Sequence, residues 1–122
     1  MPNECCNHIT ITCENIDEVS NLVKNELQHI ELNDFVFNER VHMLKRGKKG
    51  IIFEIVTDWN PDFDWLNSLL SSYPKCWIKN EWNEEGGTAG VWVGFVKNNE
   101  PFVQSMTWED LCIEARHFMF LE

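Results

Sequence analysis

The fold is decided by residues 51–96, which read IIFEIVTDWNPDFDWLNSLLSSYPKCWIKNEWNEEGGTAGVWVGFV. Residues 51–57 form an apolar run interrupted by Glu54, and this pattern predicts a central strand buried on both faces. Asn60 and Pro61 predict the N-cap and the first residue of a helix, because an asparagine side chain caps well and proline suits the first turn. The stretch therefore starts as a strand that leads directly into a helix.

The expected helix carries an apolar stripe at three- and four-residue spacing, and Pro74 ends it. The stripe consists of Phe63, Leu66, Leu69, Leu70 and Tyr73. Residues 75–83 then alternate between apolar and polar side chains, residues 84–87 predict a turn, and residues 88–96 return as a strand. Residues 51–96 thus predict one βαββ unit.

Two further features complete the expected element order. Residues 8–13 alternate as a half-buried strand does, and an amphipathic helix follows from about Ile16 to His29. Residues 35–37 predict a short strand, and Thr107 resembles the start of a capping box that opens a last helix. We expect a single domain over residues 1–122, since a chain of this length supports one core.

The charge of the chain limits its partners. Twenty acidic and ten basic residues give a formal net charge of −10, which disfavours phosphate backbones and anionic membranes and favours basic partners. No apolar run approaches the roughly 20 residues that span a bilayer, and the first residues lack the layout of a signal peptide. We therefore expect the protein to act in the cytoplasm of the cell that makes it.

No residue pattern predicts a catalytic or metal site. Cys5, Cys6 and His8 lie within four residues, but zinc ligands need a second pair further along the chain, and none has that spacing. Asp62 and Asp64 are explained by the dipole of the helix start. Five cysteines and four histidines are otherwise scattered. We predict no cofactor, no metal and no enzyme, although a catalytic triad that assembles only in space stays open as an alternative.

The segment from Arg40 to Lys49 is basic within an acidic chain. It holds half of the ten basic residues, namely Arg40, Lys45, Arg46, Lys48 and Lys49. One interpretation is a solvated loop around Gly47 and Gly50. The other is a finger that contacts phosphates, whose affinity would depend on salt. No aromatic stacking platform lies beside it, which argues against recognition of RNA bases.

Six tryptophans are many for so short a chain, and tryptophan is enriched at the centres of protein interfaces. Trp59 at a strand end and Trp65 on the outer side of the second helix are the best candidates for an exposed aromatic surface. The alternative is that both cover the ends of the core with one wet edge.

Two blocks of the chain resemble a known family. The first is Met1-Pro2-Asn3 with Cys5 and Asn7, and the second runs from Phe53 through Thr57, Trp59 and Pro61 to Tyr73-Pro74, Glu85-Gly86 and Gly90. Together they cover about half the chain and are similar to the YubB-type ferredoxin-like domain family of phages, plasmids and mobile elements, whose function is unknown. The chain departs from that family in having Glu4 in place of a tryptophan and in lacking a Trp-Gly-Thr-Lys-Trp segment.

The resemblance implies an α+β fold. This fold is a ferredoxin-like βαββαβ sandwich with strands one and three central and parallel, two helices on one face, an extra edge strand and a C-terminal helix. The other face of the sheet would then be covered by the last helix or by a partner.

Three classes of function follow. The first is an acidic accessory protein of a phage or mobile element that binds and inhibits a host nucleic-acid-processing defence complex, of the anti-CRISPR or anti-restriction type. Its expected contact residues are Trp59, Trp65, Glu84, Glu85, Glu109, Asp110 and Glu114. The alternatives are a nucleic-acid binder that uses the basic segment and an uncharacterised enzyme. A homodimer also stays open.

Overall fold

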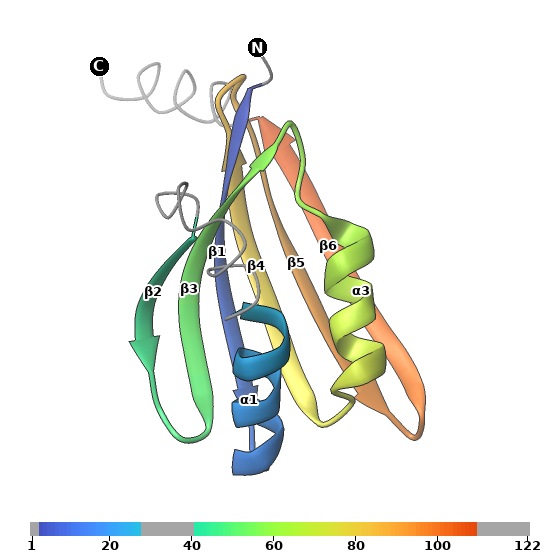
Figure 1. Cartoon of the computed structure of the whole chain (residues 1–122). Coiled ribbons are helices and arrows are strands. Elements are labelled where there is room, and N and C mark those ends of the chain that lie inside the picture. The colour runs from blue at the N-terminus through green and yellow to red at the C-terminus, as the bar shows by residue number, and fades with distance from the viewer. Residues whose placement is uncertain (1–2, 28–40, 110–122) are drawn as a thin grey trace, which may run out of the picture.

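The computed structural model describes residues 3–27 and 41–109, and within them one antiparallel sheet dominates (Figure 1). Its strands run in the order β2-β3-β1-β4-β5-β6. They are β1 (Glu4–Cys13), β2 (Val41–Arg46), β3 (Gly50–Asp58), β4 (Cys76–Glu84), β5 (Thr88–Lys97) and β6 (Glu100–Glu109). The helices are α1 (Ile16–Leu22), which continues into the π-helical turn η1 (Val23–Leu27), and α3 (Phe63–Ser72).

The expected ferredoxin-like βαββαβ sandwich is wrong. The described residues instead form a broad six-stranded sheet with two short helices, and β1 pairs with β3 in antiparallel rather than parallel orientation. The order of elements along the chain does not determine which strands pair, and β6 was not among the expected strands. The prediction that residues 51–57 are buried on both faces is also wrong, because in β3 only Ile51 and Phe53 are buried, and both face the helices.

Both helices lie on the same face of the sheet (Figure 1). The strand registers place Phe53, Ile9, Asn80 and Trp92 side by side in one row across that face. The alternation predicted for β1 and β4 is confirmed, since their odd and even residues, respectively, are buried under the helices. No described helix covers the opposite face, which we call the open face.

Side-chain caps fix where the helices begin. Asn15 accepts hydrogen bonds from the backbone N–H groups of Asp17 and Glu18, at 3.0 and 3.2 Å, and so starts α1. Asp62, rather than the expected Asn60, caps α3 by accepting from the N–H of Trp65 at 3.0 Å. The first helical residue is accordingly Phe63 and not Pro61.

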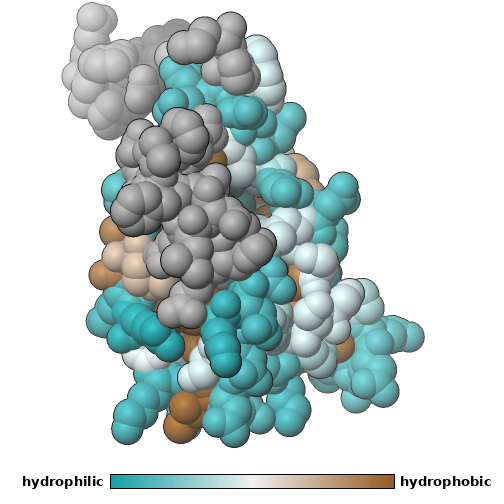
Figure 2. All heavy atoms as spheres, viewed as in Figure 1, coloured by the Kyte–Doolittle hydropathy of each residue, from teal (hydrophilic) through white to brown (hydrophobic). Residues whose placement is uncertain are grey.

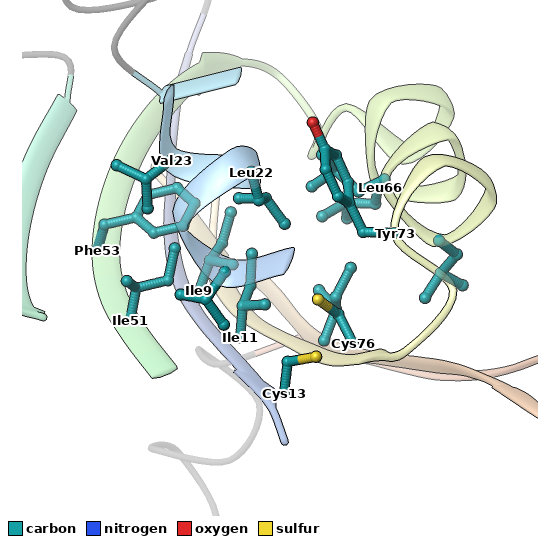
Figure 3. Close-up of a cluster of buried hydrophobic side chains, with 14 of the residues drawn as sticks. Ile9, Ile11, Cys13, Leu22, Val23, Ile51, Phe53, Leu66, Tyr73 and Cys76 are labelled. Carbon is teal, nitrogen blue, oxygen red and sulfur yellow. The ribbon is translucent and has the colours of Figure 1, made fainter. Parts of the chain in front are cut away.

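The core lies between the helices and the middle strands (Figure 3). Leu22 from α1 and Leu66 from α3 pack with Phe53 of β3 and Ile9 and Ile11 of β1. Each of these five side chains is almost fully buried. Burial of this much apolar surface, at about 25 cal/mol per Å², is the main stabilising contribution.

Two glycines of β5 leave room for the rings of neighbouring tryptophans. A Cβ at Gly90 would meet the Trp82 ring and the backbone oxygen of Met106 at 2.6 Å. A Cβ at Gly94 would lie 2.6 Å from the Trp92 ring and 2.7 Å from Leu70. At Gly90 the backbone of β6 therefore approaches closely, since Met106 of that strand supplies the contacting oxygen.

A strand replaces the start of the expected last helix. Asn98 and Asn99 have φ angles of 55° and 65°, which is the conformation of a two-residue type I′ hairpin turn. This turn returns the chain as β6 through Glu109. Residues 107–109 are therefore extended, and the rest of the expected helix lies outside the described residues, as does the expected strand at 35–37.

Candidate functional site

Glu84 and Glu85, two expected partner-binding acids, are occupied in holding the sheet together. The Glu84 carboxylate accepts hydrogen bonds from the Asn3 side chain at 2.6 Å and from the Gly86 N–H at 2.8 Å. The Glu85 carboxylate accepts from the backbone N–H of Glu4. These contacts fix the start of β1 against the β4–β5 turn, so both acids have a structural role.

The two candidate tryptophans differ in exposure. Trp59 follows β3 with a left-handed φ of 67° and is 52% exposed. The backbone N–H of Trp59 donates to the backbone oxygen of Asn3 at 2.8 Å, and this hydrogen bond fixes the turn. Trp65 is half-buried and packs against the core, so the structure does not place it on the outer side of α3 as expected.

The basic segment is a strand and a hairpin rather than a loop. Lys45 and Arg46 end β2, and Lys48 and Lys49 lie in the turn before β3. All four side chains are exposed. Arg40, Asp110 and Glu114 lie outside the described residues, and Glu109 is the last residue of β6. The structure therefore brings four of the five cations together, and of the expected acids it describes, Glu109 pairs with Thr88, the first residue after the turn that carries Glu84 and Glu85.

The open face carries an apolar patch on β5 and β6. It consists of Val91, Val93, Phe95, Phe102, Met106 and Trp108, which cross-strand pairing places together. Phe95 and Phe102 stack with ring centroids 5.6 Å apart and are 39% and 45% exposed, and Met106 is 65% exposed. Exposed apolar groups that are contiguous mark interaction sites more often than single ones do. We call this set the open-face patch.

β6 is also an edge strand. It pairs with β5 through ten consecutive residue pairs without a bulge, and among the described residues no strand pairs with its other side. Residues 100–109 contain no lysine or arginine. From Phe102 onward the edge is regular and free of both such charges and proline, so it is competent to pair with another strand.

The cysteine cluster at the start of β1 is divided between the two faces of the sheet. Cys5 faces the helices, whereas Cys6 and His8 face the open side. Burial raises the pKa of the Cys5 thiol, and burial together with the Glu54 carboxylate raises the pKa of Cys6. Raised pKa values reduce the thiolate fraction that nucleophilic chemistry and metal binding need. Within residues 3–27 and 41–109 no group of three or more potential metal ligands is found.

No helix in the described part of the chain combines the length and the apolar character needed to cross a membrane. Comparisons with family models, with curated proteins and with solved structures found no match for the chain. The resemblance to the YubB-type family therefore stays a prediction.

Sequence reasoning missed β6 and with it the open-face patch. The signal was present, because Asn98 and Asn99 separate two runs rich in aromatic and β-branched residues. Asparagine tolerates a positive φ better than other residues with side chains, so the pair is compatible with a tight hairpin turn. The apparent capping box at Thr107 obscured this signal.

Proposed function

We propose that the protein is a binding factor that receives an extended segment of another protein at the free edge of β6. The observation that carries the proposal is the long, unbulged edge strand with the exposed apolar patch beside it. The backbone groups on the outer side of β6 would form a ladder with the incoming strand. Side chains of that strand would pack beside Phe102 and Met106 on the open face.

Charge favours a basic segment over a second copy of this chain. Two copies would each bring a formal charge of −10. The only charged side chains on β6 are Glu100 and Glu109, so self-pairing would bring like charges alone to the shared edge, which is destabilising. A segment with an apolar centre and lysine or arginine at its ends complements β6 in both respects.

The acidic charge also supports the inhibitor class of function. Proteins that process nucleic acids carry basic surfaces, and an acidic ligand is steered toward such a surface by long-range electrostatics. We extend the proposal to an accessory protein that occupies a nucleic-acid-processing complex in the host cytoplasm. A reducing compartment fits the cross-strand neighbours Cys13 and Cys76, which are both free thiols.

Selection from a library of random peptides, each long enough to span β6, tests the proposal. We expect the recovered peptides to share alternating apolar residues with basic residues at the ends. Their binding should be lost in the double variant Val103→Lys, Met106→Lys, since both side chains are exposed on β6. Peptides that bind this variant as tightly as the parent protein would contradict the proposal.

One observation favours a second candidate function, binding of nucleic acid. Four exposed cations gather on the β2–β3 hairpin. If they bind phosphates, substitution of Lys45, Arg46, Lys48 and Lys49 by alanine abolishes retention on immobilised nucleic acid and flattens its salt dependence. Retention that is equal in the parent and the variant excludes this hairpin as the contact.

A further inference from the structure

Two buried asparagines form a directional network beneath α3. Asn7 and Asn80 face each other on β1 and β4, and each is only 1% exposed. The Asn7 Nδ2 group donates to the backbone oxygens of Cys5 and Ile55 at 3.2 and 3.0 Å and to Thr57 Oγ1 at 2.9 Å. These three acceptors fix the orientation of the Asn7 amide, so its Oδ1 faces Asn80.

This orientation determines that of Asn80. Asn80 Nδ2 donates to Asn7 Oδ1 at 2.9 Å. A flipped Asn80 amide would place two carbonyl oxygens against each other, which is unfavourable. Asn80 Oδ1 is consequently left buried without a hydrogen-bond partner. A buried acceptor in this state is destabilising unless a donor from outside the network satisfies it.

The Asn80 side chain also lines a cavity beside this network. The cavity has a volume of about 130 Å³ and lies between the first turn of α3 and strands β1, β3 and β4. Ile9, Ile55 and Leu66 give it apolar walls. One water occupies about 30 Å³ in the liquid, so the cavity exceeds the size of a single water and is large enough for a short alkyl chain with a polar head.

The rim of the cavity is negative. Asp62 lines the cavity with an exposed side chain, and its Oδ1 accepts from the Trp65 N–H at 3.0 Å. Asp64 lies in the same first turn, and together the two carboxylates exceed the partial positive charge of the helix start. The half-buried Trp65 indole completes this side of the cavity and offers an aromatic surface to a cation.

We propose that this cavity binds a primary alkylammonium group, from a free amine or from a lysine side chain. An ammonium head has three N–H donors and no acceptor. It therefore satisfies the unpaired Asn80 oxygen and interacts with the Asp62 carboxylate. The alkyl stem packs against the apolar walls. This site is independent of strand binding at β6, because it lies on the helix-covered face.

Titration of the full chain with propylammonium chloride, followed by NMR, tests the site. We expect saturable shifts of the Asn80 side-chain amide and the Trp65 indole N–H, with a dissociation constant on the order of millimolar. Sodium chloride at equal ionic strength should not reproduce them. 1-Propanol, which is neutral and nearly isosteric, should bind more weakly.

A matched pair of variants isolates the contribution of charge. Asp62→Asn keeps a good N-cap but removes the rim carboxylate, so we expect affinity for propylammonium to fall roughly three- to fivefold. Asp64→Asn removes the same charge from the same turn at a position that does not line the cavity, and its affinity should change less. Equal losses of affinity in the two variants would show that only the overall negative charge attracts the ligand. That result would contradict binding in this cavity.

The source of the ammonium group is distinguished by a second ligand. Nα-acetyl-lysine amide that shifts the same two signals supports a lysine side chain, whereas shifts with propylammonium alone support a free amine. If neither ligand shifts Asn80 or Trp65, or if 1-propanol binds as well as propylammonium, the proposal is overturned.

Discussion

The two edges of the sheet, β2 and β6, are built in opposite ways. β2 is six residues long, has an irregular register between Met43 and Lys45, and ends in exposed cations. β6 is ten residues long, pairs without interruption and exposes apolar side chains on both faces of the sheet. Bulges and charges are the features by which natural sheets prevent unwanted strand pairing. The chain therefore protects one edge and leaves the other competent to bind.

The two faces of the sheet also differ from each other, as its two edges do. Residues on the helix-covered face pack into the core, and Figure 2, which views the molecule from the helix side, shows that the described surface on this side is largely hydrophilic. The open face instead carries the stacked Phe95 and Phe102 next to the free edge. Patch and edge meet at β6, which is why we assign binding to that strand.

The largest effect is expected from placing charges on the free edge. The double variant Val103→Lys, Met106→Lys should weaken binding of selected peptides by about tenfold or more, because two cations oppose a basic strand and remove apolar contacts. Surface plasmon resonance measures the affinity. Leu44→Lys is the matched control, since Leu44 is an exposed apolar residue on the protected edge. If the β6 double variant and Leu44→Lys lost the same peptide affinity, the two edges would not differ in binding.

A smaller but measurable effect concerns the support beneath β6. Gly94→Ala should lower the free energy of unfolding by about 1–3 kcal/mol, because its Cβ would overlap the Trp92 ring and Leu70. Gly47→Ala at the β2–β3 hairpin should change it by about 0.5 kcal/mol or less, since the nearest atom is 3.7 Å away. Urea unfolding measures both, and similar values would show that the two ends of the sheet are packed alike.

The elements that could be predicted from the sequence are those whose pattern lies within a few consecutive residues. Alternation in β1 and β4 and the apolar stripe of α3 are local, so these elements were predicted correctly, except that Phe63 of the stripe is 37% exposed. The cap at Asp62 was misplaced by two residues, because asparagine and aspartate are equally good caps. Strand order depends on pairing across the chain, and the open-face patch exists only once β6 is paired with β5. The partnerless oxygen of Asn80 likewise appears only when β1 and β4 are adjacent.

Buried thiols limit the pH range in which the edges can be compared. Burial raises the pKa of Cys5 and, together with neighbouring Cys13, that of Cys76 above the ordinary 9.0. The folded state then keeps protons that the unfolded state loses, so stability should fall as the pH rises above about 9, by at most about 1.4 kcal/mol per pH unit for each thiol. Urea unfolding between pH 7 and 10 measures the slope. Cys76→Val should flatten it, and an unchanged slope would show that this thiol does not contribute.

The smallest effect is expected at the protected edge. Replacing Lys45 and Arg46 by threonine removes the charges but keeps the register irregularity of β2. We expect a slight rise in self-association at high protein concentration, measured by sedimentation, and unchanged peptide affinity. If the β2 edge of this variant bound the selected peptides about as tightly as β6 does, charge alone would distinguish the two edges.

The most direct test of the central claim is amide hydrogen exchange, followed by NMR, with and without a selected peptide. Alternate β6 residues point their backbone N–H groups away from β5, except Pro101, which has none. The account predicts that these outward amides become protected on binding while those of β2 do not change. Protection that appears at β2, or binding that leaves every β6 amide unchanged, would contradict strand addition at β6.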